Sequence, residues 1–232
     1  MTDKSITSNA RYLKNPIRIL YEDQEVAVFD KPSGLLVIPT NKNEQNTLVN
    51  IVNYQYARGQ QFKFHPCHRL DKETSGAIIF AKGKKAQQVM MTLFKERAIQ
   101  KKYIAIIHGH LKEKSGEIKK AVGHSLHSGY RKPVSTKPAL TRFKVLKTIK
   151  SCSVVLVEPV TGRTNQIRIH FSQKGHPLVG DRKYSIAKNY DLKFRRTALH
   201  AHQLRWTSPF HHKQINVQSD LPKDMEVFLA SH

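Results

Sequence analysis

The chain has 232 residues, of which 39% are hydrophobic and 8% aromatic. This length and composition predict a folded globular protein and exclude one that is disordered throughout. Forty Lys and Arg against 17 Asp and Glu give a formal net charge of +23, whereas a magnitude of roughly 2–8 keeps a small domain soluble. A field of this sign concentrates polyanions. We therefore expect a nucleic acid as the partner, and no membrane, because no segment shows the amphipathic pattern of an interfacial helix.

The N-terminal residues, the apolar runs and the cysteines restrict the class of protein further. Residues 1–16 are polar and without the apolar core of a signal peptide, so we expect a flexible tail followed by one folded domain over 17–232. Apolar runs reach about five residues, against the roughly 20 that a membrane span needs. Cys67 and Cys152 show no disulfide-scaffold spacing and equally suit free thiols in a reducing compartment. A cytoplasmic protein is expected.

In chain order, Arg18–Tyr21 and Val26–Phe29 are predicted strands, joined by a polar turn. The Pro and Gly in Lys31–Gly34 end the second strand. Leu48, Ile51, Val52 and Tyr56 follow at helical spacing, with Asn46 or Thr47 as the N-cap.

The middle of the chain alternates strands with one clear helix. Apolar residues of 86–94 line one helix face and charged residues the other. The remaining predicted elements are three strands and a short terminal helix, at Ala77–Ala81, Tyr103–Ile107, Ser153–Val157 and Asp224–Leu229. Residues 119–140 hold scattered Gly, Pro, Ser and basic residues and are predicted to be long loops that face the nucleic acid. Without a regular βαβ alternation, the pattern favours an α+β fold with a largely antiparallel or mixed sheet.

A polar turn directly before the predicted strand 77–81 carries the first candidate residue. The turn is His68–Gly76, and its only acids are Asp71 and Glu73. A turn rich in hydrogen-bonding groups can hold Asp71 rigidly at a sheet edge. An Asp in a turn more often caps backbone amides, so this segment alone favours the structural role.

The second candidate segment is Thr161–His170. Alternation places Gln166, Arg168 and His170 on one face of a predicted strand. Such a face suits the wall of a polar cleft and equally suits a solvated edge strand.

These segments resemble the RluA-type pseudouridine synthase family. His68–Gly76 with the following Phe80-Ala81-Lys82 is similar to its HRLDxxTSGxxxFAK signature. Further segments resemble the family in the same order: Tyr21–Pro39, Lys101–Tyr103 with Ala105 and Gly109, Gly162–His170, His176–Asp181 with Tyr184, and Leu199–Ala201 ahead of Ser208-Pro209. The resemblance covers most of the chain and implies an α+β fold with a bent sheet, flanking helices and a central catalytic cleft.

The resemblance also implies a function. It identifies an enzyme that converts uridine to pseudouridine in structured ribosomal or transfer RNA, as a catalytic domain without the S4 module of many relatives. Asp71 matches the essential aspartate, Tyr103 the tyrosine that stacks on the target base, Arg168 the basic residue that pairs with the aspartate, and Arg69 the arginine that fills the space of the flipped base. No cofactor, metal or obligate protein partner is implied. The expected RNA contacts are Arg69, Arg163, Gln166, Lys119, Lys120, Arg131 and Lys132.

The chemistry accounts for these residue types. The reaction breaks the bond between ribose C1′ and uracil N1 and joins C1′ to C5. A carboxylate can attack C1′ or stabilise positive charge there, as carboxylates do in glycoside hydrolysis. A neighbouring guanidinium favours the ionised carboxylate. Because the base must leave its stack at a cost of a few kcal/mol, stacking on Tyr103 and filling by Arg69 offset that cost.

Two positions depart from the family pattern. Asn165 stands where many members have His, which we expect to change a supporting contact without loss of catalysis. Cys67 replaces an aliphatic residue and is expected to pack as a small hydrophobe. The cluster His65, Cys67 and His68 lacks the spacing of a zinc site, so no metal is expected.

Two rivals remain. One is a catalytically inactive protein of the same fold that binds or folds RNA, against which the intact Asp71, Tyr103 and Arg168 weigh. The other is an aspartate-based glycosidase or nuclease, which lacks an evident second carboxylate, because Glu73 lies in the same turn as Asp71.

Overall fold

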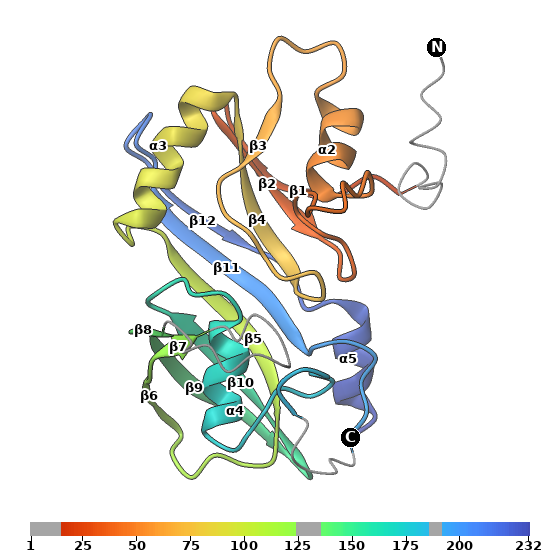
Figure 1. Cartoon of the computed structure of the whole chain (residues 1–232), viewed down its shortest axis with the longest axis vertical. Helices are drawn as coiled ribbons and strands as arrows, with labels where there is room; N and C mark the ends of the chain where they lie inside the picture. The colour runs from red at the N-terminus through yellow and green to blue at the C-terminus, as the bar shows by residue number, and fades with distance from the viewer. Residues whose placement is uncertain (1–14, 124–135, 186–191) are drawn as a thin grey trace. The chain divides into compact units, whose positions relative to one another are not determined.

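The computed structural model describes residues 15–123, 136–185 and 192–232. They fall into two compact units (Figure 1). Unit 1 comprises residues 1–100 and 200–222, and unit 2 comprises residues 101–199 and 223–232.

The described residues of unit 1 form a mixed sheet with two helices. Its strands are β1 (Ile19–Glu22), β2 (Val26–Lys31), β3 (Phe64–Pro66), β4 (Ser75–Lys82), β11 (Leu199–Thr207) and β12 (Gln214–Gln218). Its helices are α2 (Leu48–Tyr56) and α3 (Lys84–Lys95). The order is β1-β2-β4-β11-β12, with β3 also paired to β4. The pair β4–β11 is parallel and the others are antiparallel, so the sheet is mixed, as expected for the α+β class.

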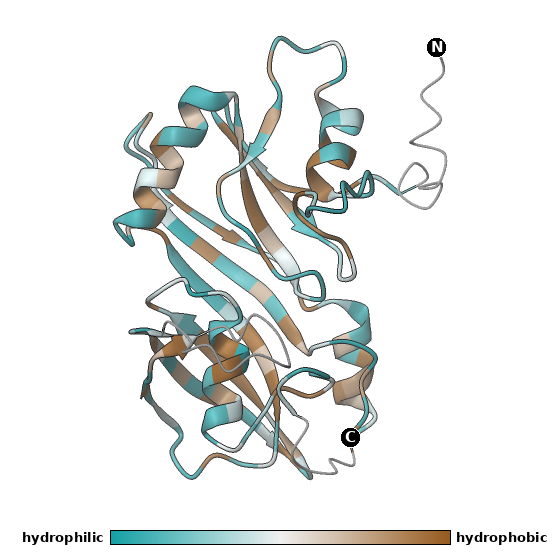
Figure 2. Ribbon diagram, in the orientation of Figure 1, coloured by the Kyte–Doolittle hydropathy of each residue, from teal (hydrophilic) through white to brown (hydrophobic). Residues whose placement is uncertain are grey.

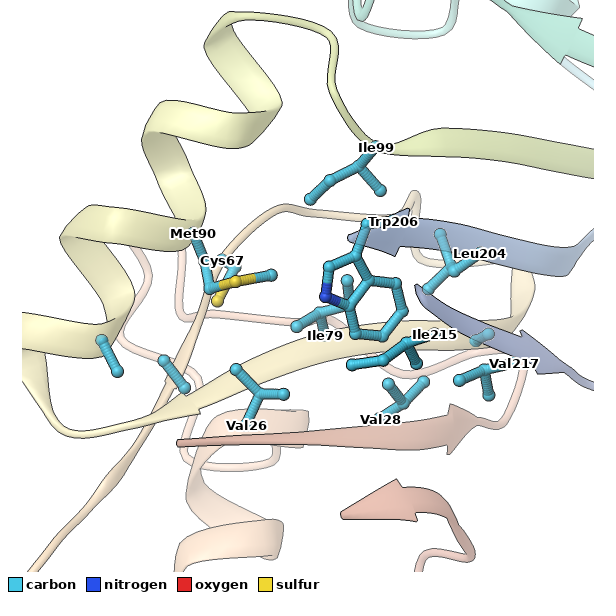
Figure 3. Close-up of a cluster of buried hydrophobic side chains, with 13 residues drawn as sticks. Val26, Val28, Cys67, Ile79, Met90, Ile99, Leu204, Trp206, Ile215 and Val217 are labelled. Atoms are coloured by element: carbon cyan, nitrogen blue, oxygen red, sulfur yellow. The ribbon is translucent and has the colours of Figure 1, made fainter. Parts of the chain in front are cut away.

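The core of unit 1 forms around β4. Seven of the eight β4 residues are buried, and most of the strand is coloured as hydrophobic in Figure 2. Figure 3 shows Ile79 of β4 in a cluster with Met90 of α3 and Trp206 of β11. Cys67 lies in the same cluster, which confirms that it packs as a small hydrophobe. The turn His68–Gly76, which holds the candidate Asp71, is therefore attached to the most deeply buried strand of its unit.

In unit 2 the described residues form an antiparallel sheet, two helices and a small pair of strands. Its strands are β5 (Gln100–His108), β6 (Ser115–Lys119), β7 (Val122–Gly123), β8 (Thr136–Lys137), β9 (Leu140–Ile149) and β10 (Cys152–Pro159). Its helices are α4 (Gln166–Gln173) and α5 (Lys223–Ala230). The sheet order is β5-β10-β9-β6, and β7 pairs with β8. Among the described helices, none is long and apolar enough to cross a membrane.

Most predicted elements are confirmed. Five of the six predicted strands correspond to β1, β2, β4, β5 and β10, and the three predicted helices to α2, α3 and α5. The N-cap of α2 is Thr47, although its side chain forms no capping hydrogen bond. The turn between β1 and β2 is stabilised by Asp23, whose Oδ1 accepts hydrogen bonds from the backbone N–H groups of Glu25 and Val26. The tail 1–16 lies mostly outside the described residues.

The predicted strand over Asn165–His170 is wrong. The chain forms α4 there, and Gln166, Ile167, Ile169, His170 and Phe171 are buried. The isoleucines at 167 and 169 share one face in a strand but lie about 200° apart around a helix, so the local pattern favoured the strand. Asn165 precedes the helix with a φ of 55°, a left-handed conformation that Asn adopts more readily than most residues. Burial within unit 2 selects the helix.

The prediction of long loops over 119–140 is also partly wrong. Residue 119 ends β6, and β7 and β8 form a two-stranded hairpin within this range. Val122 and Ala139 are buried and pack with Ile169 of α4. Scattered Gly, Pro and basic residues obscured two short strands, and the two apolar residues in and beside them contact a helix distant in sequence. Residues 124–135 lie outside the described part of the chain.

Candidate active site

The turn that carries Asp71 is fixed at both of its ends in unit 1. At its start, the backbone N–H of Cys67 donates to the Ile79 carbonyl at 3.0 Å, and the ring Nε2 of His68 accepts the Ile79 N–H at 3.0 Å. Near its end, the Thr74 N–H donates to the Asp71 carbonyl at 3.1 Å. Asp71 itself is half-buried. The turn thus presents a partly exposed carboxylate on a fixed backbone.

Lys31 secures the second half of this turn. The side chain is fully buried, and its Nζ donates to the carbonyls of Pro32, Lys72 and Thr74 at 3.0, 3.1 and 2.7 Å. A buried ammonium that donates to three carbonyls satisfies groups that would otherwise be desolvated and unpaired. The sequence pattern did not indicate this role for Lys31, which is the last residue of strand β2.

The residues after Lys31 bind the same turn. The Ser33 hydroxyl donates to the Glu73 carbonyl at 2.7 Å, and the Gly34 N–H donates to the Lys72 carbonyl at 2.8 Å. Together with Lys31, they take up the carbonyls of the three residues that follow Asp71. The hydrogen bonds of this Lys-Pro-Ser-Gly segment therefore hold the backbone that follows Asp71 in place.

Gly76 allows β4 to begin close to β11. Its φ is +108°, and a Cβ built on it would lie 2.3 Å from the Ala201 carbonyl oxygen. Only glycine fits this contact. Next to it, the Ser75 hydroxyl meets His200 Nδ1 at 3.0 Å, and His200 Nε2 meets the Ser219 carbonyl at 3.1 Å. Because a carbonyl only accepts, Nε2 carries the proton and Nδ1 accepts from Ser75. The last residues of the turn are therefore locked to β11.

In unit 2, Arg168 of α4 forms a paired hydrogen bond with Asp181. Its Nε and Nη2 donate to the two carboxylate oxygens at 2.7 and 2.9 Å. The Asp181 side chain is fully buried and that of Arg168 is 13% exposed. Asp181 also accepts the N–H groups of Lys183 and Tyr184. Such a planar fork fixes the direction of a guanidinium.

Asn165 and Tyr184 complete the surroundings of Arg168. Arg168 Nη1 donates to Asn165 Oδ1 at 3.1 Å, and Asn165 Nδ2 donates to the Tyr184 hydroxyl at 3.1 Å. The Arg168 guanidinium carbon lies 5.0 Å from the centre of the Tyr184 ring, within the range of a cation–π contact. Asn165, where the sequence departs from the family pattern, is therefore a hydrogen-bond acceptor for Arg168.

Three comparisons with known proteins bear on this arrangement. Residues 25–173 match the family model described as RNA pseudouridylate synthase. The uncharacterized RNA pseudouridine synthase YhcT of Bacillus subtilis is 34% identical over 213 residues, which cover 90% of this chain and 70% of that protein. The chain belongs to the RNA pseudouridylate synthase family. Its reaction class is the isomerisation of uridine to pseudouridine in RNA.

Further relatives agree with this assignment. The ribosomal large subunit pseudouridine synthase D of Nitrosomonas europaea is 35% identical over 225 residues, which cover 93% of this chain and 65% of that protein. The solved structure of human RNA pseudouridylate synthase domain containing 4 matches with a TM-score of 0.76 and 25% identity, and the match covers 91% of both chains. Sequence and fold therefore place the chain in the same synthase family.

The residues predicted for the synthase site lie in both units. Asp71 and the exposed Arg69 belong to the turn of unit 1. Tyr103 lies on β5 of unit 2, 9% exposed and opposite Val157 of β10, and Arg168 lies on α4. The pairing of Arg168 with Asp71 stays a prediction. The structure adds Asp181 as the partner of Arg168. Asp181 lies in a family-like segment, and no role was expected for it from the sequence. Its isolation was a possible signal, because it is the only acidic residue between Glu158 and Asp191.

Gln166 is an interior residue. It is 3% exposed, and its amide donates to the Leu140 carbonyl and the Thr141 hydroxyl while its Oε1 accepts from Thr161 Oγ1 and the Arg163 N–H. All four bonding positions of this amide are taken. The expectation that Gln166 contacts RNA is therefore corrected: its polarity serves to join α4 to β9.

The other predicted RNA contacts lie on the surface or outside the described residues. Arg163 is exposed, with its Nε 3.4 Å from the Pro138 carbonyl. Lys119 and Lys120 are exposed at the end of β6, and Lys119 pairs with Glu117 at 2.7 Å. Arg131 and Lys132 fall in 124–135, outside the described residues. Within the described part of the chain, no group of three or more His, Cys, Asp or Glu side chains is arranged to hold a metal.

Proposed function

We propose that Asp71 is the catalytic carboxylate of this synthase. It attacks ribose C1′ of the target uridine, or stabilises positive charge there, as the C1′–N1 bond breaks. The free uracil turns, C5 bonds to C1′, the C5 proton leaves and N1 gains a proton, so the product is an isomer of the substrate. The balance of atoms requires no cofactor.

The observation that carries this proposal is the support of the Asp71 backbone by Lys31, Ser33 and Gly34. Their hydrogen bonds to the carbonyls of residues 72–74 restrict the turn while the Asp71 side chain is left half-buried. A group that acts on a reacting carbon must be held in place before the substrate arrives. A merely capping aspartate would not require a buried lysine beneath its own turn.

The roles of Tyr103 and Arg168 are carried over from the family resemblance. Tyr103 is proposed to stack on the target base and to help remove its C5 proton, and Arg168 to pair with Asp71 and favour its ionised form. The fork from Asp181 supports the second role, because it gives the guanidinium one direction. Arg69 is proposed to fill the space that the flipped base leaves.

The proposed substrate is a uridine in structured ribosomal or transfer RNA, modified in the cytoplasm. The relative from Nitrosomonas europaea acts, by its name, on the large ribosomal subunit, which favours ribosomal RNA. The exposed lysines and arginines of unit 2 are proposed to bind the phosphates: Arg163, Lys119, Lys120, Arg142, Lys144 and Lys147. Arg131 and Lys132, which lie outside the described residues, are proposed for the same role from the sequence alone. Along β9, Thr141 and Phe143 point inward while Arg142 and Lys144 are exposed, so one strand face carries positive charge.

Tritium release tests the catalytic role. RNA labelled at uracil C5 is taken from cells that lack this gene and is incubated with wild type, Asp71→Asn or Glu73→Gln. Wild type and Glu73→Gln should release tritium, whereas Asp71→Asn should not, although its RNA affinity is unchanged. Turnover by Asp71→Asn close to that of wild type would remove Asp71 from the role.

The rival function is a catalytically inactive RNA-binding protein of the same fold. It predicts tight, salt-sensitive RNA binding without tritium release by any of the three proteins, provided that the RNA contains unmodified target uridines. Mapping of pseudouridines in ribosomal and transfer RNA from cells with and without the gene supplies this check and identifies the modified position.

A further inference from the structure

A basic pocket lies in unit 1 at the end of β4 that is remote from the Asp71 turn. It is a cavity of about 540 Å³, within the usual range of ligand sites. Its walls are the loop between α2 and β3, the strand β3, and the junction of β4 with α3 (Figure 1). Its lining residues include five basic residues and one phenylalanine: Lys63, His65, Lys82, Lys84, Lys85 and Phe62. No acidic residue lines it.

Positive charge in this pocket is largely unneutralised. Lys82 pairs with Glu22 at 2.7 Å and its Nζ lies 5.3 Å from the centre of the Phe62 ring. Lys63, Lys84 and Lys85 form no ion pair with any acidic residue that the structure describes. The pKa of His65 is lowered by burial and further by the charges of Lys84 and Lys63. The basic side chains of the pocket thus lie close enough to repel one another.

The start of α3 adds a second positive feature at the same place. The N-cap is Gly83, which provides no side-chain hydrogen bond, and the first turn of the helix contains no acid. Helix N-termini carry a partial positive charge and favour anions. Here Lys84 and Lys85 occupy the first turn instead, which is unfavourable for the helix alone. The Gly83 N–H donates to the Lys63 carbonyl at 2.9 Å, so the loop lysine is held beside the helix start.

We propose that this pocket binds backbone phosphates of the substrate RNA at a distance from the target uridine. The inference rests on the proposed function, since it takes the RNA that is modified as the ligand. An anion at this position would neutralise the three lysines and occupy the uncapped helix start. RNA is favoured over a small anion because the cavity is larger than one phosphate needs and opens beside exposed lysines on two elements.

The geometry of β4 sets the distance between pocket and turn. The strand runs from Ser75, next to the Asp71 turn, to Lys82 in the pocket, a separation of roughly 23 Å at about 3.3 Å per residue. One stacked strand covers this distance with about seven nucleotides at ~3.4 Å each. The pocket therefore contacts RNA phosphates outside the immediate neighbourhood of the modified base. It favours substrates whose flanking structure is long enough to reach it.

The test compares two triple variants that remove the same charge. The pocket variant is Lys63→Ala with Lys84→Ala and Lys85→Ala. The control is Lys95→Ala with Lys112→Ala and Lys213→Ala, all exposed lysines outside the pocket. Affinity for the labelled RNA from cells that lack this gene is measured over a range of KCl concentrations. The pocket variant should lose at least tenfold in affinity at low salt. The slope of its plot of log Kd against log salt should decrease by about 2, because each phosphate that the protein no longer neutralises lowers the slope by ~0.7. The control should stay near wild type.

Two further measurements separate this proposal from the proposed function. At saturating RNA, the pocket variant should keep the wild-type kcat for tritium release while its KM rises. On an RNA trimmed to within about three nucleotides of the mapped uridine, wild type and pocket variant should bind equally. If wild type released no tritium but the salt slope still depended on the pocket lysines, the proposed function would fail and the pocket would stand.

Three outcomes would overturn the pocket proposal. Equal losses in both triple variants would show a delocalised field in place of a site. An unchanged salt slope in the pocket variant would show that RNA does not contact these lysines. Inorganic phosphate that shifts the His65 resonances of wild type, combined with RNA affinity independent of the lysines, would assign the pocket to a small anion. The pocket variant should melt no lower than wild type, because removal of cations at a helix start does not weaken the helix.

Discussion

Arg168 and Asp181 are joined by two parallel hydrogen bonds of 2.7 and 2.9 Å, and the Asp181 carboxylate has no solvent exposure. The carboxylate also accepts two backbone N–H groups, which hold the segment after it. A buried charge with this many partners is costly to leave unpaired. Asp181 is thus a positioning residue for the arginine that the family resemblance assigns to catalysis.

Asp181→Asn should lower both stability and turnover. The substitution removes the charge that balances Arg168 and replaces one acceptor by a donor, so the free energy of unfolding should fall by about 3 kcal/mol. Displacement of the guanidinium should lower kcat on the order of 10²-fold. Urea unfolding and tritium release at saturating RNA measure the two effects. Glu113→Gln is the control, because Glu113 pairs with Lys174 at the surface, and it should resemble wild type.

Lys31→Met should destabilise unit 1. Methionine keeps the length of the side chain but leaves the carbonyls of Pro32, Lys72 and Thr74 without their ammonium donor, which should cost at least about 3 kcal/mol. Turnover should fall further than the folded fraction explains, because the Asp71 turn loses its support. The exposed Lys72 provides the control Lys72→Met. Wild-type unfolding and kcat in Lys31→Met would contradict the role of Lys31.

Gly76→Ala should be far more damaging than Gly59→Ala. Both glycines have positive φ, +108° and +81°, but a Cβ at Gly76 would lie 2.3 Å from the Ala201 oxygen while one at Gly59 meets nothing within 4 Å. Gly59→Ala should therefore cost only the backbone strain of about 1–2 kcal/mol. Gly76→Ala must also separate β4 from β11 and should cost more than about 4 kcal/mol. Equal melting temperatures would refute the close approach.

Stability should depend on pH near neutrality through His170. Burial lowers the pKa of His170, and its Nδ1 and Nε2 meet Thr141 Oγ1 at 2.8 Å and the Lys120 carbonyl at 3.0 Å. The unfolded chain binds a proton below about pH 6.5, while the folded chain resists it. This contribution is therefore present above about pH 6.5 and is lost as the pH falls towards the lowered pKa of the folded state.

Melting curves at about pH 7.5 and pH 5.5 measure this dependence. Wild type should melt lower at the acidic pH, and His170→Gln, which keeps a donor for the Lys120 carbonyl, should show a smaller difference. The remaining difference is expected from His108 and His65, whose pKa values burial also lowers. A pH dependence in His170→Gln as large as that of wild type would exclude His170 as a source.

Much of unit 1 could be predicted because its signals are local. The apolar run Ala77–Ala81 is a buried strand wherever it lies, and the spacing of apolar residues in α3 marks one face of a helix. The residues of the family signature lie within one turn and the strand that follows it, so Asp71 was identifiable as a candidate from the sequence. Their hydrogen-bond partners were not: Lys31 lies about 40 positions earlier in the chain, and its contact with the turn exists only once β2 and β4 pair.

The segment Asn165–His170 shows where local pattern fails. Its alternation fits a strand, yet it forms α4, because Gln166 and His170 bond to β9 and to the segment after β6. The strands β6, β9, β11 and β12 were not predicted, since their pairing partners stabilise them more than their own sequences do.

The sequence by itself determined the reaction class of this protein through its family, its positive charge and its α+β class, and it identified Asp71 as the candidate catalytic carboxylate. Tertiary structure decided which groups support that chemistry. It placed Asp181 against Arg168, buried Lys31 beneath the Asp71 turn and turned Gln166 inward. The physical reason is that a buried charge or amide must find partners within the fold. Those partners come from segments that only chain folding brings within hydrogen-bonding distance.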